Sequence, residues 1–148
     1  FGAARSEPRY RPGMTLPAHM TSAAGAAAAI REELAAGDVG FAMRLLAEAV
    51  TTGFRSLHPA GQATWLATPP SGTGDPRWDA LLAGIAEHLA VVWGHPVPAW
   101  ASLPAPLAEP WFPGGAAGGV LEEQVCARTW PELRRRGIHL DPAELIAV

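Results

Sequence analysis

The side chains best suited to ligate a soft metal ion are His88, His95, Cys126 and His139. Sites built from such residues use short, regular spacings, for example two cysteines two residues apart or two histidines one helical turn apart. Neither spacing occurs among these four residues. We therefore predict no metal site and interpret His88 as a surface histidine on the polar side of a helix.

Nucleophiles and acid–base pairs are equally poorly supported. The sequence has no Gly-x-Ser-x-Gly motif, and Cys126 lies in a predicted amphipathic helix, where a buried structural thiol is expected. Glu122 and Glu123 fit an exposed helix face. Asp75 and Asp79 fit the cap and the first turn of a helix, where the backbone N–H groups favour a carboxylate. The sequence therefore predicts no catalytic residue and no enzymatic activity.

A glycine-rich stretch at residues 114–119 precedes a predicted helix, which is where a phosphate-binding loop would lie. The stretch lacks the Gly-Lys-Ser/Thr ending of such loops, and no strand is predicted before it. We interpret it as a flexible loop and predict no cofactor.

The most concentrated charge is the run Arg134, Arg135, Arg136, followed by Gly137. Cations are favoured near a helix C-terminus, so a solvated helix end is one interpretation. Arginine also suits carboxylates and phosphates, so contact with an acidic partner is the other. Three consecutive residues spread around a helix, so all three cannot serve one face.

Further candidate contacts lie in proline-rich segments. Residues 1–25 are rich in Pro, Gly, Arg and Ser, and we expect them to form an extended, flexible arm because Pro8, Pro12 and Pro17 exclude a long helix. A second proline-rich segment, residues 95–119, carries large aromatic residues. The residues predicted to bind a partner are Arg9, Tyr10, Arg11, Trp111, Phe112, Arg134, Arg135 and Arg136.

Hydrophobic periodicity predicts the helices that position these residues. Helices over 26–36 and 39–57 should form a hairpin, with Gly37 at the turn and Asp38 as the cap of the second helix. Residues 58–74 are expected to be a loop. The clearest helix starts at Asp75-Pro76 and ends at Gly94. Its expected apolar stripe is Trp78, Leu82, Ile85, Leu89 and Val92.

The rest of the chain is expected to hold shorter elements: a turn near 99–103, a helix over 120–128, and a helical turn opened by a capping box of Thr129 and Glu132. An extended stretch over 138–140 and a short helix from Asp141-Pro142 follow. The fold class predicted is mainly α: a compact domain of about four to six helices with long Pro/Gly-rich loops and an extended N-terminal arm. Residues 26–148 form one predicted domain.

Composition narrows the class of protein. The chain has 148 residues, 49% of them apolar and 17% charged, which allows a hydrophobic core. Every basic residue is an arginine, and the net charge of −3 argues against DNA as a partner, so DNA is only weakly supported. A single cysteine fits a reducing compartment, and no stretch has the length of a membrane span. We expect a cytoplasmic protein that does not enter the membrane.

A helix-turn-helix arrangement is a weaker alternative for the predicted hairpin. Ala36, Gly40 and Leu46 follow the small-residue and glycine pattern of such motifs. The second helix offers only Arg44 and Arg55 to read bases. A plain helical hairpin is the better interpretation.

The stretches IREELAAGDVGFAMRLLAEAV, DPRWDALLAGIAEHLA, VPAW, EPWFPG and PELRRRGIHLDPAEL resemble a poorly characterised group of actinobacterial antitoxin-like and helix-turn-helix regulator proteins. The similarity covers about residues 26–148. It implies a cytoplasmic partner-binding or regulatory domain, in some members encoded beside a toxin-like nucleotidyltransferase. Matching positions, implied to be structural or partner-facing, are Asp75, Arg77, Trp78, Asp79, Trp111, Arg135, Arg136 and Gly137.

Three hypotheses about function remain open. The first is the protein-binding domain of an antitoxin-like or regulatory protein, which neutralises or recruits a protein partner such as a cognate toxin. The second is a transcription regulator or effector domain with DNA contact. The third is a small-molecule binder or small enzyme with an aromatic-lined pocket between the Trp78 helix and the Trp111 loop. Assembly into a homo-oligomer is also left open.

Overall fold

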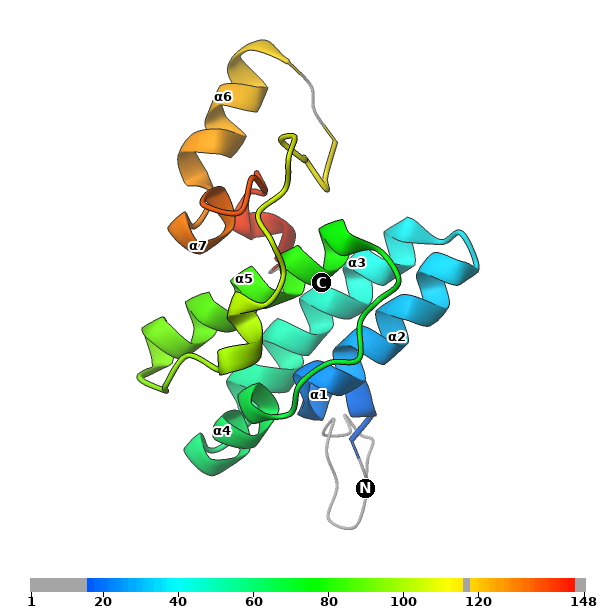
Figure 1. Cartoon of the computed structure of the whole chain (residues 1–148), viewed down its shortest axis with the longest axis vertical. Coiled ribbons are helices and arrows are strands. Elements are labelled where there is room, and N and C mark those ends of the chain that lie inside the picture. Colours follow the sequence, from blue (N-terminus) through cyan, green and yellow to red (C-terminus); the bar gives the residue numbers. More distant parts are fainter. Residues whose placement is uncertain (1–15, 116–117, 146–148) are drawn as a thin grey trace, which may run out of the picture.

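The computed structural model describes residues 16–115 and 118–145, and these residues confirm a mainly α fold (Figure 1). The α-helices and the shorter π- and 3₁₀-turns (η) are α1 (Ala18–Thr21), α2 (Ala23–Ala35), α3 (Val39–Glu48), η1 (Ala49–Gly53), η2 (Phe54–Ser56), α4 (Pro59–Ala67), α5 (Pro76–Trp93), η3 (Ala99–Ser102), α6 (Gly119–Arg128), α7 (Pro131–Arg134) and η4 (Pro142–Leu145).

The predicted hairpin of α2 and α3 is confirmed. Gly37 takes a left-handed conformation at the turn, with φ +80°. Asp38 then caps α3, because its Oδ1 accepts a hydrogen bond from the Phe41 N–H at 3.0 Å. At the other end of the hairpin, Ser22 caps α2 by accepting from the Gly25 N–H at 2.9 Å.

The arm was predicted to reach residue 25, and its last part is helical instead. α1 begins directly after Pro17, and α2 begins at Ala23, which is fully buried. Gly25 allows α1 and α2 to touch, because a Cβ at this position would overlap the carbonyl group of Ala18. Residues 1–15 lie outside the described residues.

The predicted helix over 39–57 changes its geometry at Ala49. A π-turn, η1, and a 3₁₀-turn, η2, replace its second half. The close approach of α1 accompanies this change: a Cβ on Gly53 would lie 2.6 Å from the carbonyl oxygen of Met20. A regular apolar pattern could not reveal this contact because it comes from a distant segment.

α4 lies within the predicted loop over 58–74, so that prediction was wrong. Pro59 occupies the first helical position, where its missing N–H costs nothing, and starts the helix rather than breaking it. Trp65 and Leu66 are buried and anchor this segment to the core. Gln62 is buried as well, and its amide oxygen pairs with His95 Nε2 at 2.9 Å.

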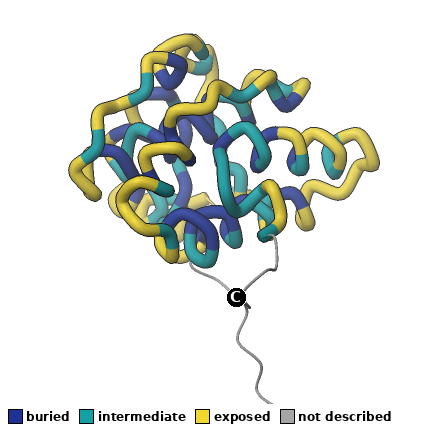
Figure 2. Tube along the Cα trace, turned by 90° about the horizontal axis from the view of Figure 1, so that it is seen from below, coloured by how far each residue is buried: buried dark blue, intermediate teal, exposed yellow. Residues whose placement is uncertain are grey.

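α5 forms the centre of the core, with the predicted start and end. Asp75 caps it by accepting from the Arg77 N–H at 2.9 Å, and Gly94 ends it with φ +78°. Every residue from Ala80 to Ala86 is buried, which a narrow apolar stripe does not predict. Val92 was expected in the core but is 60% exposed, because the buried part of α5 ends at Ala90. In Figure 2 the buried stretches run through the interior, and the exposed ones form the outer turns.

The C-terminal third joins the core through α7, the extended residues after it, and η4. Ile138 forms a parallel bridge with Trp111, and Leu140 and Leu145 are buried. α6 buries none of its residues and lies at the end of the molecule away from α1 and α4 (Figure 1). Cys126, predicted to be buried in this helix, is therefore only half-buried.

The predicted capping box of Thr129 and Glu132 is absent. Thr129 instead joins two segments: its hydroxyl donates to the Val125 carbonyl at 2.7 Å and accepts from the Leu140 N–H at 2.9 Å. Glu132 pairs with His88 on α5. These tertiary contacts replace the local cap.

Candidate binding groove along helix α5

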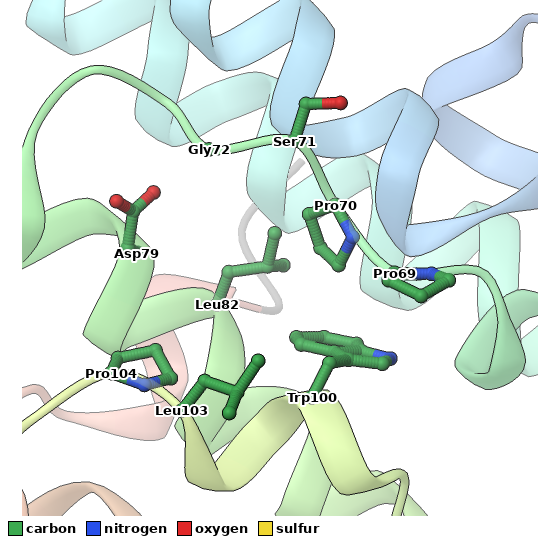
Figure 3. A pocket seen from close by; sticks show the side chains of 9 residues that line it. All are labelled: Pro69, Pro70, Ser71, Gly72, Asp79, Leu82, Trp100, Leu103 and Pro104. Carbon is green, nitrogen blue, oxygen red and sulfur yellow. The ribbon is translucent and has the colours of Figure 1, made fainter.

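The N-terminal half of α5 borders an open hollow of about 190 Å³ (Figure 3). One wall comes from the loop between α4 and α5, and the other from η3 and the residues after it. Apolar side chains predominate in the lining, which consists of Pro69, Pro70, Ser71, Gly72, Asp79, Leu82, Trp100, Leu103 and Pro104.

A second hollow of about 450 Å³ continues from the first and shares Asp79, Leu103 and Pro104 with it. Its other lining residues are Pro76, Ala105, Pro106, Leu107 and Ala108. We call the two hollows together the α5 groove. Leu103 stands between them and is 80% exposed, so the groove is an open, elongated surface rather than a closed cavity.

Hydrogen bonds from the core hold one wall of the groove in place. The Trp100 indole N–H donates to the Leu66 carbonyl at 2.7 Å, which fixes the ring. Arg136 donates to the Ala101 carbonyl at 2.9 Å, and its own carbonyl accepts from the Leu107 N–H at 2.9 Å. The wall is thus preformed. A ligand does not have to order it on binding, which lowers the entropic cost of binding.

Asp79 holds the opposite wall and, among the described residues that line the α5 groove, is the only charged one. Its Oδ1 accepts from both the N–H and the hydroxyl of buried Thr73, at 2.7 and 2.8 Å. Arg31 secures the same loop by donating to the Gly72 carbonyl at 3.1 Å. In Figure 3 the Asp79 carboxylate lies at the rim of the hollow, towards the loop that carries Gly72.

The groove offers hydrogen-bond acceptors and few donors. Its five prolines have no N–H, and the donors of Trp100 and Leu107 are already used inside the protein. Within the described residues, Asp79 forms no ion pair with an arginine or a histidine. Chemically, the groove fits an apolar ligand that carries hydrogen-bond donors.

The three arginines predicted to contact a partner, Arg134–Arg136, differ in their exposure to solvent. Arg136 is 9% exposed and pairs with Glu87 at 2.7 Å, and it also donates to two backbone carbonyls. Arg135 pairs with the same carboxylate at 3.0 Å but is exposed, and Arg134 donates to the Thr129 carbonyl at 2.8 Å. Arg136 is thus a core contact, which leaves Arg134 and Arg135 at the surface.

Opposing effects act on the pKa of Glu87. Burial raises it, but the hydrogen bonds from Arg136 and Arg135 outweigh burial, so the pKa lies below its ordinary value. The carboxylate therefore stays charged between two cations and joins α5 to α7.

Trp111 and Phe112 lie beside residues 137–139 and do not line the α5 groove. Trp111 packs edge-on against Trp78 at 5.9 Å, with the Arg77 guanidinium 5.0 Å from its ring centre. Phe112 stacks on His139 at 5.0 Å. The pocket expected between the Trp78 helix and the Trp111 loop is therefore filled by direct ring contact. Arg9, Tyr10 and Arg11 lie outside the described residues.

His88 was interpreted as a surface histidine, and the structure corrects this. Its ring stacks on Trp130 at 3.6 Å between centres, and its Nδ1 pairs with Glu132 at 2.9 Å. The side chain is 18% exposed. Over the described parts of the chain, no three His, Cys, Asp or Glu residues gather closely enough to hold a metal ion.

Sequence reasoning missed the α5 groove. It assigned residues 58–74 to a loop and 95–119 to a proline-rich segment without placing them together. It explained Asp79 as a first-turn carboxylate, and the resemblance implied for it a structural or partner-facing role. The one local signal was the short turn expected near 99–103, which η3 confirms. The prolines of the loop between α4 and α5 and those after η3 face each other only because both segments cross α5, and this arrangement is tertiary.

Comparison with protein families, with curated proteins and with solved structures gives no match to this chain. The antitoxin-like resemblance and the cytoplasmic location therefore stay predictions. No helix within residues 16–115 and 118–145 has both the length and the hydropathy of a membrane span.

Proposed function

We propose that this chain is a binding domain for a protein partner and that the α5 groove holds an extended segment of that partner. The observation that carries the proposal is an elongated apolar groove whose walls are fixed from the core by Trp100, Arg136 and Asp79. Preformed grooves of this kind recognise peptide segments through apolar contacts and a few directed polar groups.

An extended occupant fits the groove better than an enclosed small molecule. Leu103 projects between the two hollows and is 80% exposed, so an occupant would cross it and fill both sides. The lining contains no His, Cys or Arg, and Ser71 is its one hydroxyl side chain. The groove therefore supports binding more strongly than nucleophilic chemistry.

Selection of binders from a random peptide library tests this proposal. Bound peptides should shift the NMR signal of the Trp100 indole N–H, which is assigned by its loss in Trp100→Phe, and leave the signal of Trp130 in place. Peptides that bind without moving the Trp100 signal, or a library that yields no binder, would overturn the proposal.

A pair of exposed apolar residues provides the matched variants for this experiment. Leu103→Ser should weaken peptide binding about tenfold, because a leucine contact is lost. Val92→Ser should leave binding unchanged, since Val92 is also exposed but does not line the groove. Equal losses in both variants would place the binding surface elsewhere.

The antitoxin-like role implied by the resemblance is a finer proposal. If a neighbouring gene encodes the partner, co-expression of the two products should give a complex that survives gel filtration. Leu103→Ser should weaken this complex and Val92→Ser should not. A chain that runs as a free protein beside that product would contradict the role.

A further inference from the structure

We propose that the α5 groove selects a partner segment with a basic side chain, arginine or lysine, which Asp79 binds. The inference rests on the proposed function and names the chemistry of the partner. It assigns Asp79 two tasks: Oδ1 holds the loop through Thr73, and Oδ2 meets the incoming cation.

Asp79 has the capacity for this second task. Both of its hydrogen bonds from Thr73 reach Oδ1, and within the described residues Oδ2 accepts none. No arginine or histidine of the described chain forms an ion pair with the carboxylate. Among the aspartates at helix starts, Asp75 pairs with Arg77 and Asp141 with Arg128. Asp38 also forms no ion pair within the described residues, but it does not line the α5 groove. Over residues 16–115 and 118–145, Asp79 thus presents a carboxylate that forms no ion pair.

The walls on both sides of Asp79 match the rest of a basic side chain. Lysine and arginine only donate hydrogen bonds, and they carry long apolar stems. The groove supplies the reverse: acceptors, proline rings, Leu82 and the face of Trp100, a ring type that also attracts cations. The lining contains no cation that would repel the ligand.

The second hollow defines what should accompany the cation. Its lining beyond Asp79 is apolar, with Leu103, Pro106 and Leu107 among its residues. A segment that places its basic residue at Asp79 would lay neighbouring apolar residues across Leu103. The partner class is therefore a basic residue next to apolar ones in an extended stretch of protein.

Peptides from the library selection test the inference through their charge. Replacing the basic residue of a selected peptide by citrulline, which has the shape of arginine without its charge, should weaken binding at least about tenfold, as expected when a charge-assisted hydrogen bond becomes a neutral one. Asp79→Asn should remove this difference between the two peptides. If the citrulline peptide binds as tightly and still shifts the Trp100 indole signal, the inference fails while the proposed function stands.

Asp79→Asn also changes the group that accepts the hydrogen bonds from Thr73. Variants of exposed Leu103 leave those hydrogen bonds in place and provide a second test. Leu103→Arg should weaken binding of the basic peptide well beyond the loss in Leu103→Glu, because a new cation beside Asp79 competes for its carboxylate. Raising the salt concentration should reduce the gap between these two variants. Equal binding by both would overturn the inference.

Discussion

Glu87 and the arginines around it illustrate how burial decides the role of a charge. Arg135 and Arg136 are neighbours in sequence and share one carboxylate, yet their side chains are 59% and 11% exposed. Arg136 also donates to the carbonyls of Glu132 and Ala101, so it joins α5, α7 and η3. An exposed ion pair contributes little to stability, whereas breaking a buried one leaves a charge without its partner.

Substitution of each arginine should separate these roles. Arg136→Ala is expected to reduce the free energy of unfolding by about 3 kcal/mol, because Glu87 and two carbonyl groups lose a buried partner. Arg135→Ala should cost less than about 1 kcal/mol. Urea unfolding followed by circular dichroism measures both, and similar losses would show that burial does not distinguish the two pairs.

Glu87 also predicts a dependence of stability on pH. Its pKa in the folded protein lies below the ordinary value of 4.5, so the carboxylate stabilises the fold above that pH and stops doing so as the pH falls through the folded pKa. Glu87→Gln should therefore be less stable than the native chain at neutral pH by roughly 2 kcal/mol. The difference in the free energy of unfolding between Glu87→Gln and the native chain should become smaller in acid. Urea unfolding across the pH range measures this difference, and a difference that stays constant would contradict the prediction.

At the scale of elements, two glycines decide how the N-terminal helices meet. Gly25 lies where α1 touches α2, and Gly53 lies where α1 touches η1. Both leave room for backbone atoms of another segment. Neither glycine has a positive φ, so neither is needed for a left-handed turn. Their role is to let the backbones of two segments lie close together.

Alanine at two helical glycines should have opposite effects. Gly25→Ala is expected to destabilise the fold by about 1–3 kcal/mol, because its Cβ would overlap the backbone of Ala18. Gly40→Ala should stabilise it by up to about 1 kcal/mol, since that Cβ meets nothing closer than 3.8 Å and the unfolded chain loses freedom. Thermal unfolding measures both. A Gly25→Ala protein as stable as the native chain would rule out the tight contact.

At the scale of the whole molecule, segments from both halves of the chain form one core. η4 packs on α3, and its Leu145 belongs to the same hydrophobic cluster as Leu46 and Trp78. α5 connects the two halves, since it contacts α2 on one side and α7 and η3 on the other. Loss of a distant core contact should therefore weaken the entire domain.

Two leucines near the C-terminus test this shared core. Leu145→Ala is expected to lower the free energy of unfolding by about 2–5 kcal/mol, because it empties a buried position. Leu121→Ala on α6 should change it by less than about 0.5 kcal/mol, since Leu121 is 62% exposed. Both should unfold in a single transition by fluorescence and circular dichroism. Two separate transitions for Leu145→Ala would indicate that η4 lies outside the cooperative core.

The sequence by itself determined the features that depend on local physics. Asp38 and Asp75 cap α3 and α5, and Gly37 and Gly94 follow the ends of α2 and α5, because capping and left-handed turns involve residues close in the chain. The same information was ambiguous at Pro59, since a proline both breaks a helix and starts one.

Tertiary structure decided which residues face one another. The loops before and after α5 meet across Asp79 and Leu103, and no periodic pattern encodes that meeting. The burial of Arg136 and His88 likewise depends on α7 packing against α5, and the rings of Trp111 and Trp78 fill the space where a pocket was expected. Local patterns specify helices and their ends, whereas a groove between loops follows from how those helices share one core.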